Sequence, residues 1–323
     1  SFYLQQLNLM GSNEFTPNIN AFVNFELTNT YSSSAGWGSF SIREAWVKYR
    51  FSNELNVKAG LSVPVFNNLN EIKNRTPLLP YIFRPFVYEA SIADIFPANE
   101  LVPEHAFLQV YGFAPIGEVK LDYAAYVGNG DQQNINASPT NYFSRGQDTT
   151  LFKMVGGRVG VRTGHFKAGV SMTADKDNGA LLGLGPVPRQ RFGADLSFEI
   201  SGLSGEFEMI AVHHVMTQEQ TATLAAVAGM VPAVGTNLDK LFYYGLLSYD
   251  ITEKVFAYAG YNYLKDKSVT ALDYGLQGIT VGGGFRVHSR VVVKGQYLNI
   301  KILDNPSFGF HENHFIVAVS VFF

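Results

Sequence analysis

Histidine and carboxylate side chains stand close together at three places in the sequence and could bind a metal ion there. His213 and His214 are adjacent, and adjacent residues of a strand point to opposite faces, so this pair cannot share one ion. The stretch 311–314 reads His-Glu-Asn-His, which equally suits a polar rim where a loop enters a strand. Asp175 begins the run Asp-Lys-Asp-Asn-Gly, which lacks the spacing and the late glutamate of an EF-hand loop. We therefore expect no cofactor and no dedicated metal site, although adventitious calcium could bind at Asp175 and Asp177.

The sequence also offers little that could act as a catalytic nucleophile. Ser320 and His314 share the final stretch of the chain, but nucleophilic catalysis needs a serine, a base and an orienting group in reach of one another. The run Gly282-Gly283-Gly284 is followed by no helical pattern, so it indicates a bend in a strand rather than a phosphate-binding loop. The sequence predicts a protein that is not an enzyme.

Most of the remaining polar chemistry lies in charged residues of both signs that alternate with apolar ones. Opposite charges that face one another across a water-filled lumen are typical of a pore lining. The alternative interpretation is the solvated face of stacked soluble sheets. The residues that we expect to line a lumen are Lys48, Arg50, Lys58, Lys120, Asp122, Arg158, Arg162 and Arg191.

Alternation with a period of two predicts strands along nearly the whole chain. For example, Val57, Ala59 and Leu61 are apolar, whereas Lys58 and its alternate neighbours are polar or small. We count about fourteen strands after residue 18, or sixteen if the N-terminal segment and a long loop add a pair, each about as long as a tilted membrane strand. The fold class that we predict is an all-β transmembrane antiparallel β-barrel over residues 18–323, preceded by a lead-in or partial strand over 1–17.

The connections between these strands alternate between short and long. The short ones lie near 52, 115–117, 163–164, 201–202, 250–252 and 288–289, and the long ones cover 65–104, 130–149, 175–188, 217–238, 266–273 and 304–312. Short periplasmic turns at one end and long extracellular loops at the other are typical of transmembrane barrels. A soluble barrel with an apolar interior uses about eight strands, and a sheet of about fourteen would enclose a lumen too wide for apolar side chains to fill.

The last strand ends in an apolar face that reaches the final residue. Phe315, Val317, Val319, Val321 and Phe323 share this face. Such an ending is usual for a bacterial outer-membrane barrel, whose outer face meets lipid. By that resemblance, Phe323, Val321 and Phe315 form the signal that the barrel assembly machinery reads during insertion.

Composition supports a membrane barrel and excludes other classes. Hydrophobic residues make up 46%, aromatic residues 14% and charged residues only 16% of the 323 positions, against about 25% charged residues in soluble domains. No apolar run approaches the ~20 residues of a membrane helix. The net charge of −3 argues against nucleic acid as a partner, and a chain without cysteine forms no disulfide. We interpret the start at Ser1 as that of a mature exported product.

A set of short motifs in the first half of the chain resembles a known family. The motifs are Gly-Leu-Ser-Val-Pro-Val-Phe at 60–66, Asn-Glu at 70–71, Arg-Pro-Phe-Val-Tyr-Glu at 84–89, Val-Tyr-Gly at 110–112 and Tyr-Val-Gly-Asn-Gly at 126–130. In this order they resemble outer-membrane porins of the phosphate-selective (porin O and P) family, including its porin-like relatives. The resemblance implies a β-barrel with a long early loop that folds back and narrows the pore. It does not imply phosphate selectivity, because residues 66–104 carry both signs of charge where phosphate-selective members have a strongly basic eyelet.

The long connection 65–104 is well beyond the length of an ordinary loop, which favours a functional role. It is rich in proline and in apolar side chains, which need a surface to pack on. The inner wall of the barrel is the first candidate, and a neighbouring subunit or partner is the second. The residues that we expect at the pore constriction are Lys73, Arg75, Arg84, Glu71 and Glu89.

The segment 221–238 is apolar and uncharged although it falls at an extracellular loop. Its alanine content predicts a helix over 222–229, and such a surface needs cover. We therefore expect outer-membrane lipid as one partner, and further copies of this chain or other outer-membrane subunits, contacted through 221–238, as others. The leading function is a porin with weak anion preference, and the alternative is a plugged structural barrel within a larger outer-membrane complex.

Overall fold

The computed structural model describes residues 6–32, 36–73, 75, 78–89, 101–130, 152–177, 186–222, 237–267, 275–303 and 309–321. These residues form one antiparallel sheet of fifteen strands. The strands are β1 Gln6–Thr16, β2 Ile19–Ser32, β3 Gly36–Arg50, β4 Asn56–Ser62, β5 Ala106–Ile116, β6 Val119–Asn129, β7 Lys153–Arg162, β8 Phe166–Asp177, β9 Val187–Ile200, β10 Leu203–Val215, β11 Asn237–Asp250, β12 Val255–Asp266, β13 Leu276–His288, β14 Val291–Ile302 and β15 His311–Val321.

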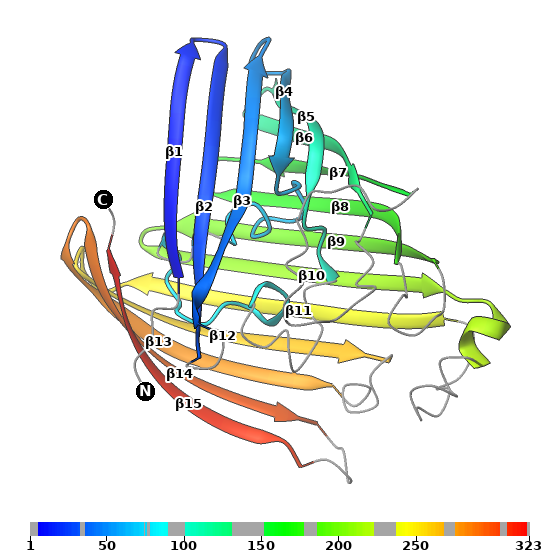
Figure 1. Ribbon diagram of the computed structural model, residues 1–323. Coiled ribbons are helices and arrows are strands. Elements are labelled where there is room, and N and C mark those ends of the chain that lie inside the picture. Colours follow the sequence, from blue (N-terminus) through cyan, green and yellow to red (C-terminus); the bar gives the residue numbers. More distant parts are fainter. Residues whose placement is uncertain are drawn as a thin grey trace.

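Each strand pairs with the next one in the chain, so the spatial order runs from β1 to β15 without a crossover. The sheet curves strongly, and strands from both ends of the chain, blue and red, lie on the same side of the view in Figure 1. The predicted short connections are confirmed as tight links between neighbouring strands. Two of them use left-handed backbone: Gly117 has φ 63° and Gly202 has φ 82°, a conformation that glycine adopts without steric cost.

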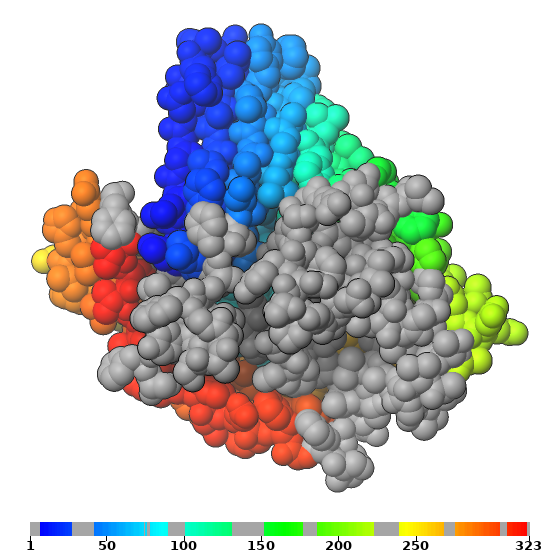
Figure 2. All heavy atoms as spheres, viewed as in Figure 1, coloured from blue at the N-terminus to red at the C-terminus, as the bar shows by residue number. Residues whose placement is uncertain are grey.

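The alternation read from the sequence decides which side chains point outward. On β15, Phe315 is 77% exposed, Val317 61% and Val319 62%, so the apolar face of the last strand looks away from the interior. On β4, Ala59 is exposed and Lys58 is buried, as the period of two predicts. Figure 2 gives the same view in space-filling form, with the blue wall of β1 to β3 standing above the red atoms of β15.

The structure describes part of the N-terminal segment 1–17 and only the two ends of the apolar segment 221–238. The N-terminal stretch 1–17 contains strand β1, which pairs with β2 over its whole length. The described part of the segment before β11 holds a short helix over 218–222, whereas the rest of the predicted helix 222–229 lies outside the described residues. Within the described residues, no helix has the length and apolar character needed to cross a membrane. Phe323 also lies outside them.

One long connection lies inside the curve of the sheet. It joins β4 to β5, and we call its described residues, 63–73, 75, 78–89 and 101–105, the crossing segment. Figure 1 shows it in cyan in front of the strands of the second half. It contains the 3-10 helix η2 Phe86–Tyr88, all three residues of which are buried. Its position makes it the element around which any internal site is built.

Candidate functional site

The crossing segment packs against the inner face of the sheet through a cluster of buried apolar side chains. The segment contributes Phe66, Leu69, Leu79, Tyr81, Phe86, Val87, Tyr88, Leu101 and Val102. Strands β10 to β14 contribute Ile210, Val212, Phe242, Tyr244, Leu246, Phe256, Tyr258, Leu264, Leu276, Leu298, Ile300 and Ile302. The apolar residues of the segment therefore contact the inner wall, the first of the two surfaces considered for them. Burial of this kind stabilises the arrangement by roughly 25 cal/mol per Å² of apolar surface.

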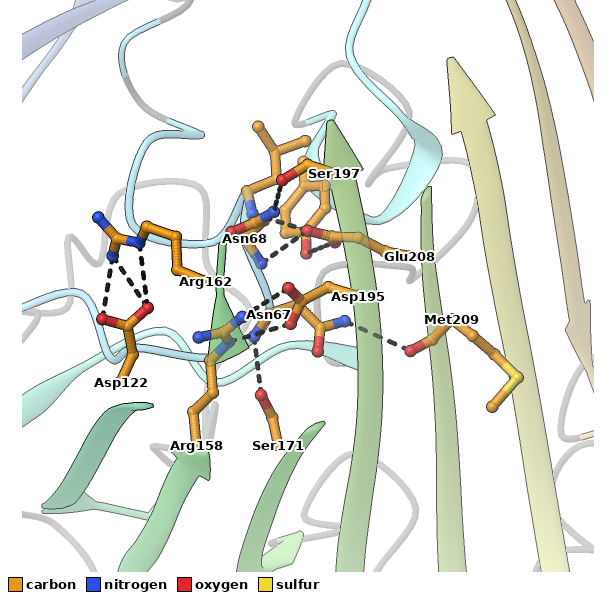
Figure 3. Close-up of polar contacts among 12 residues, drawn as sticks. Asn67, Asn68, Asp122, Arg158, Arg162, Ser171, Asp195, Ser197, Glu208 and Met209 are labelled. Carbon is orange, nitrogen blue, oxygen red and sulfur yellow. Dashed lines mark hydrogen bonds and ion pairs between the residues drawn. The ribbon is translucent and has the colours of Figure 1, made fainter. Parts of the chain in front are cut away.

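Glu208 on β10 is the main polar anchor of the segment (Figure 3). Its Oε1 accepts hydrogen bonds from the backbone N–H groups of Asn68 and Leu69, at 2.8 and 2.7 Å. Its Oε2 accepts one from the hydroxyl of Tyr88 at 2.6 Å. Burial raises the pKa of Tyr88, and the neighbouring Glu208 raises it further, so this phenol keeps the proton that it donates. One carboxylate thus holds two separate parts of the segment.

The start of the segment makes further contacts with the same wall (Figure 3). The N–H of Asn67 donates to Ser171 Oγ on β8 at 2.9 Å. Asn68 Nδ2 donates to Ser197 Oγ on β9 at 2.8 Å. Asn67 has a φ of 52°, a left-handed conformation that asparagine tolerates better than most residues. A Cβ on Gly193 would come within 2.2 Å of Asn67 Oδ1, so the glycine leaves room for the Asn67 side-chain amide.

A second anchor on β14 holds the middle of the segment. Gln296 Oε1 accepts hydrogen bonds from the N–H groups of Ile82 and Phe83, at 2.8 and 2.9 Å. Lys294 Nζ donates to the carbonyl of Leu79 at 2.5 Å. The segment is therefore fixed to two parts of the sheet that are far apart in the strand order, and it bridges the interior between them.

Arg84 and Glu89 have a different role from the one expected. Arg84 is only 7% exposed and Glu89 only 4%. The Glu89 carboxylate accepts the backbone N–H of Arg84 at 3.0 Å and lies 3.5 Å from its guanidinium, while Arg84 Nη1 donates to the carbonyl of Lys73 at 2.8 Å. This pair holds the segment in shape, and its charges compensate each other instead of facing the open interior.

Of the other three predicted constriction residues, Glu71 and Arg75 lie near β3 and β4. Glu71 lies 3.5 Å from Lys58 Nζ, and its side chain is 39% exposed. Lys58 also lies over the ring of Trp46 at 4.9 Å. Glu44 on β3 interacts electrostatically with Lys58, Arg75 and Glu71. Two acids and two bases thus meet where the segment faces the β3–β4 wall, and Lys73 lies 5.9 Å from the Tyr88 ring centre.

Several of the remaining wall charges are paired with charges on nearby strands, between β6 and β7 or between β7 and β9. Arg158 is buried and makes two hydrogen bonds to Asp195, at 3.0 and 2.6 Å. Arg162 makes three to Asp122, the shortest at 2.9 Å. Both pairs lie on the inner face in Figure 3. Arg158, Arg162 and Asp122, three of the predicted wall charges, therefore each have a partner that neutralises their charge.

The proposed adventitious calcium site does not fit the geometry. The Asp175 carboxylate is held by Arg189 at 2.6 and 2.8 Å and by Arg191 at 3.0 Å. Two guanidinium groups satisfy its charge and would repel a divalent cation. The described residues contain no group of three or more histidines and carboxylates arranged to hold a metal ion.

Other predicted residues lie at the ends of the strands. Arg50 Nη2 donates to the carbonyl of Pro17 at 2.8 Å, so it secures a turn. Lys120 is exposed, with its ammonium 5.5 Å from the Phe113 ring centre, and Lys48 lies half-buried on β3. The strongest anchors, Glu208 and Gln296, were missed. Each is a polar residue within the alternating pattern of its strand, β10 or β14. Nothing in the sequence around either residue indicates that a distant segment binds it.

Replacing Glu208 with alanine is expected to loosen the segment. Two backbone N–H groups and the Tyr88 hydroxyl lose their acceptor, and each buried donor left unpaired costs about 1–3 kcal/mol. Limited proteolysis of the folded protein should then cleave within 65–104 at least about tenfold faster, because 1.4 kcal/mol corresponds to a factor of ten. The matched control is Asp122→Ala, which removes a wall carboxylate away from the segment. Equal cleavage rates in both variants would contradict the anchoring role.

Comparison with known proteins identifies the fold. No family model and no curated protein matches the sequence. Among solved structures, the chain is similar to an anion-selective porin from Comamonas acidovorans, with 14% identity, a TM-score of 0.60 and coverage of 98% of this chain and 87% of that one. It is similar to Salmonella typhi OmpF in complex with daunomycin, with 11% identity, a TM-score of 0.62 and coverage of 98% and 89%. The outer membrane channel DcaP of Acinetobacter baumannii matches with 12% identity, a TM-score of 0.53 and coverage of 98% and 84%.

At these identities the likeness establishes the architecture. The chain has the all-β fold of bacterial outer-membrane porins and channels, and each of these similarities covers 98% of the chain. The short motifs between residues 60 and 130 resemble the phosphate-selective porin family, but these comparisons do not show that the chain belongs to it.

Proposed function

We propose that this protein is a bacterial outer-membrane porin that lets small hydrophilic solutes and ions diffuse through a water-filled lumen. The observation that carries the proposal is the crossing segment, which is anchored on two distant parts of the inner wall while the outer face is apolar and exposed. In this proposal the sheet closes into a transmembrane barrel in the outer membrane, and the segment narrows its lumen. No chemical step is involved, because selectivity arises from pore radius and lumen charge.

The narrowest passage runs between the crossing segment and the wall of β3 and β4. There, Glu44 and Glu71 oppose Lys58 and Arg75, and we include Lys73 of the crossing segment, which lies beside Tyr88, as the fifth charge of the proposed constriction. Low-dielectric walls focus the field of such charges on a permeating ion. Because the local excess is a single positive charge, the proposed pore has a weak preference for anions.

The partners that we propose follow from the outward surfaces. The exposed faces of Phe315 and Val321 would contact outer-membrane lipid and form part of the signal for the barrel assembly machinery. Further copies of this chain or other outer-membrane subunits would contact 221–238. The resemblance to the phosphate-selective porin family supports the narrowed lumen but not phosphate as the solute.

The second candidate function is a plugged structural barrel within a larger complex. The observation that favours it is the buried apolar cluster that the segment forms with β10 to β14, which fills the space between them. Conductance across a planar lipid bilayer distinguishes the two. Discrete channels from the purified protein support the porin, and a silent intact protein supports the plug.

Glu71→Lys is expected to increase the anion preference of the channel. Glu71 is the most exposed acid of the constriction, at 39%, and reversing it changes the local charge by two units in a region of focused field. The reversal potential in a tenfold potassium chloride gradient should move toward that of chloride. The control is Glu253→Lys, which reverses an exposed acid in the β11–β12 turn. An equal shift in both variants would place the selectivity outside the constriction.

A further inference from the structure

A pocket of about 370 Å³ lies between the crossing segment and the short-turn ends of β7 to β11. Pro80 contributes the segment side of the pocket, and Arg162, Lys167, Ser197, Glu199 and Glu206 are among the residues of its wall. In the proposed porin, a solute that passes the segment on its way to the short-turn end meets this pocket. Of its charged residues, Arg162 is hydrogen-bonded to Asp122.

One side of the pocket is cationic. Arg162 and Lys167 are direct cross-strand neighbours on β7 and β8. The nearby carboxylates of Asp122 and Asp195 already make hydrogen bonds to Arg162 and Arg158. In the part of the chain that the structure describes, the half-buried ammonium of Lys167 makes no direct ion pair, and it lies in the field of two bases and two acids, Arg158, Arg162, Asp195 and Asp122.

The other side of the pocket is acidic. The register places Lys167 opposite Ser197 and Ser197 opposite Glu206, so base, hydroxyl and acid occupy one row across three strands. Neighbouring strands lie about 4.8 Å apart, which separates the backbones of Lys167 and Glu206 by roughly 10 Å. Glu199, two residues beyond Ser197 on β9, is exposed and enlarges the acidic side. No direct ion pair joins the two sides among the described residues.

We propose that this pocket binds zwitterionic short peptides, with the peptide carboxylate at Lys167 and Arg162 and its ammonium at Glu199 and Glu206. An extended chain spans about 3.5 Å per residue, so two residues bridge the two poles across Ser197. The two glutamates would repel a simple anion, and the two bases would repel a simple cation. A zwitterionic solute is attracted at both ends. This inference rests on the proposed porin function and names a solute class for it.

The test measures binding and conduction separately. Isothermal titration calorimetry of the detergent-solubilised protein with dialanine as the probe should show saturable binding. N-acetyl-dialanine and dialanine amide, which each lack one charged end, should bind at least about tenfold more weakly, because one charge-assisted contact contributes 1.4 kcal/mol or more. Equal affinity for one capped form would overturn the dipolar site in favour of a simple anion or cation site.

Two variants and a control locate the site. Lys167→Gln and Glu199→Gln should each weaken dialanine binding by about tenfold and make it insensitive to the cap at the corresponding end. Lys254→Gln removes an exposed base from the β11–β12 turn at the same end of the sheet, outside the pocket, and should leave the affinity unchanged. Channels that conduct in a planar bilayer without binding dialanine would refute the peptide site and leave the porin proposal intact. Dialanine binding by a protein without conductance would refute the porin instead.

Discussion

Deleting residues 68–100 is expected to raise the single-channel conductance several-fold over that of the intact protein. The deletion removes the contacts to both anchors and six of the nine apolar residues that the segment adds to the buried cluster. The lumen of the proposed barrel is then limited mainly by its wall, which is wide at this strand number. The measurement is the conductance step in a planar bilayer at fixed salt. Folding is checked independently by heat-modifiable mobility in electrophoresis.

The control for this deletion tests whether the apolar wall residues that become exposed affect the conductance. Phe242, Leu264 and Leu298 are at most 1% exposed beneath the segment and would face water after its removal. A companion deletion with these three residues changed to serine restores a polar lining and should conduct equally well. A folded deletion with unchanged conductance would show that the segment does not narrow the pore. A silent intact protein that conducts after deletion would make the plugged barrel the correct assignment.

Val317→Arg is expected to reduce insertion and folding strongly. Val317 lies near the middle of β15 on the outward face and is 61% exposed, so in the proposed barrel the arginine would face lipid. An arginine near the bilayer midplane costs about 2–4 kcal/mol on this face, enough to lower the folded population by roughly 30-fold or more. The measurement is the folded fraction after refolding into phospholipid vesicles, read from heat-modifiable mobility.

Two matched substitutions control for the position and for the charge. Val317→Leu keeps the residue apolar and should fold normally. Ser320→Arg adds the same charge on the inward face of the same strand, where Ser320 pairs with Val292, and should be tolerated. If Ser320→Arg impaired folding while Val317→Arg did not, the outward face would be in contact with water and the membrane assignment would fall.

The sequence predicted most of the fold because period-two alternation is a local property. Lys58 inward and Ala59 outward follow from two adjacent residues. The site depended on contacts that no local pattern encodes. Arg84 looked like a free charge because its partner Glu89 could equally have pointed elsewhere. Glu208 looked like a solvated wall residue, although it binds backbone groups about 140 residues away in the chain.

The anchors of the crossing segment also determine when the segment can fold relative to the rest of the chain. The segment leaves the chain after β4, yet it is held by Ser171, Glu208, Lys294 and Gln296, which follow it by between 104 and 215 residues. Closing such long loops carries an entropic cost that must be met before the contacts form, and contacts distant in sequence slow folding. We therefore expect the segment to pack only after the C-terminal half of the sheet has formed. Until then its apolar side chains are exposed, and a chaperone could bind them.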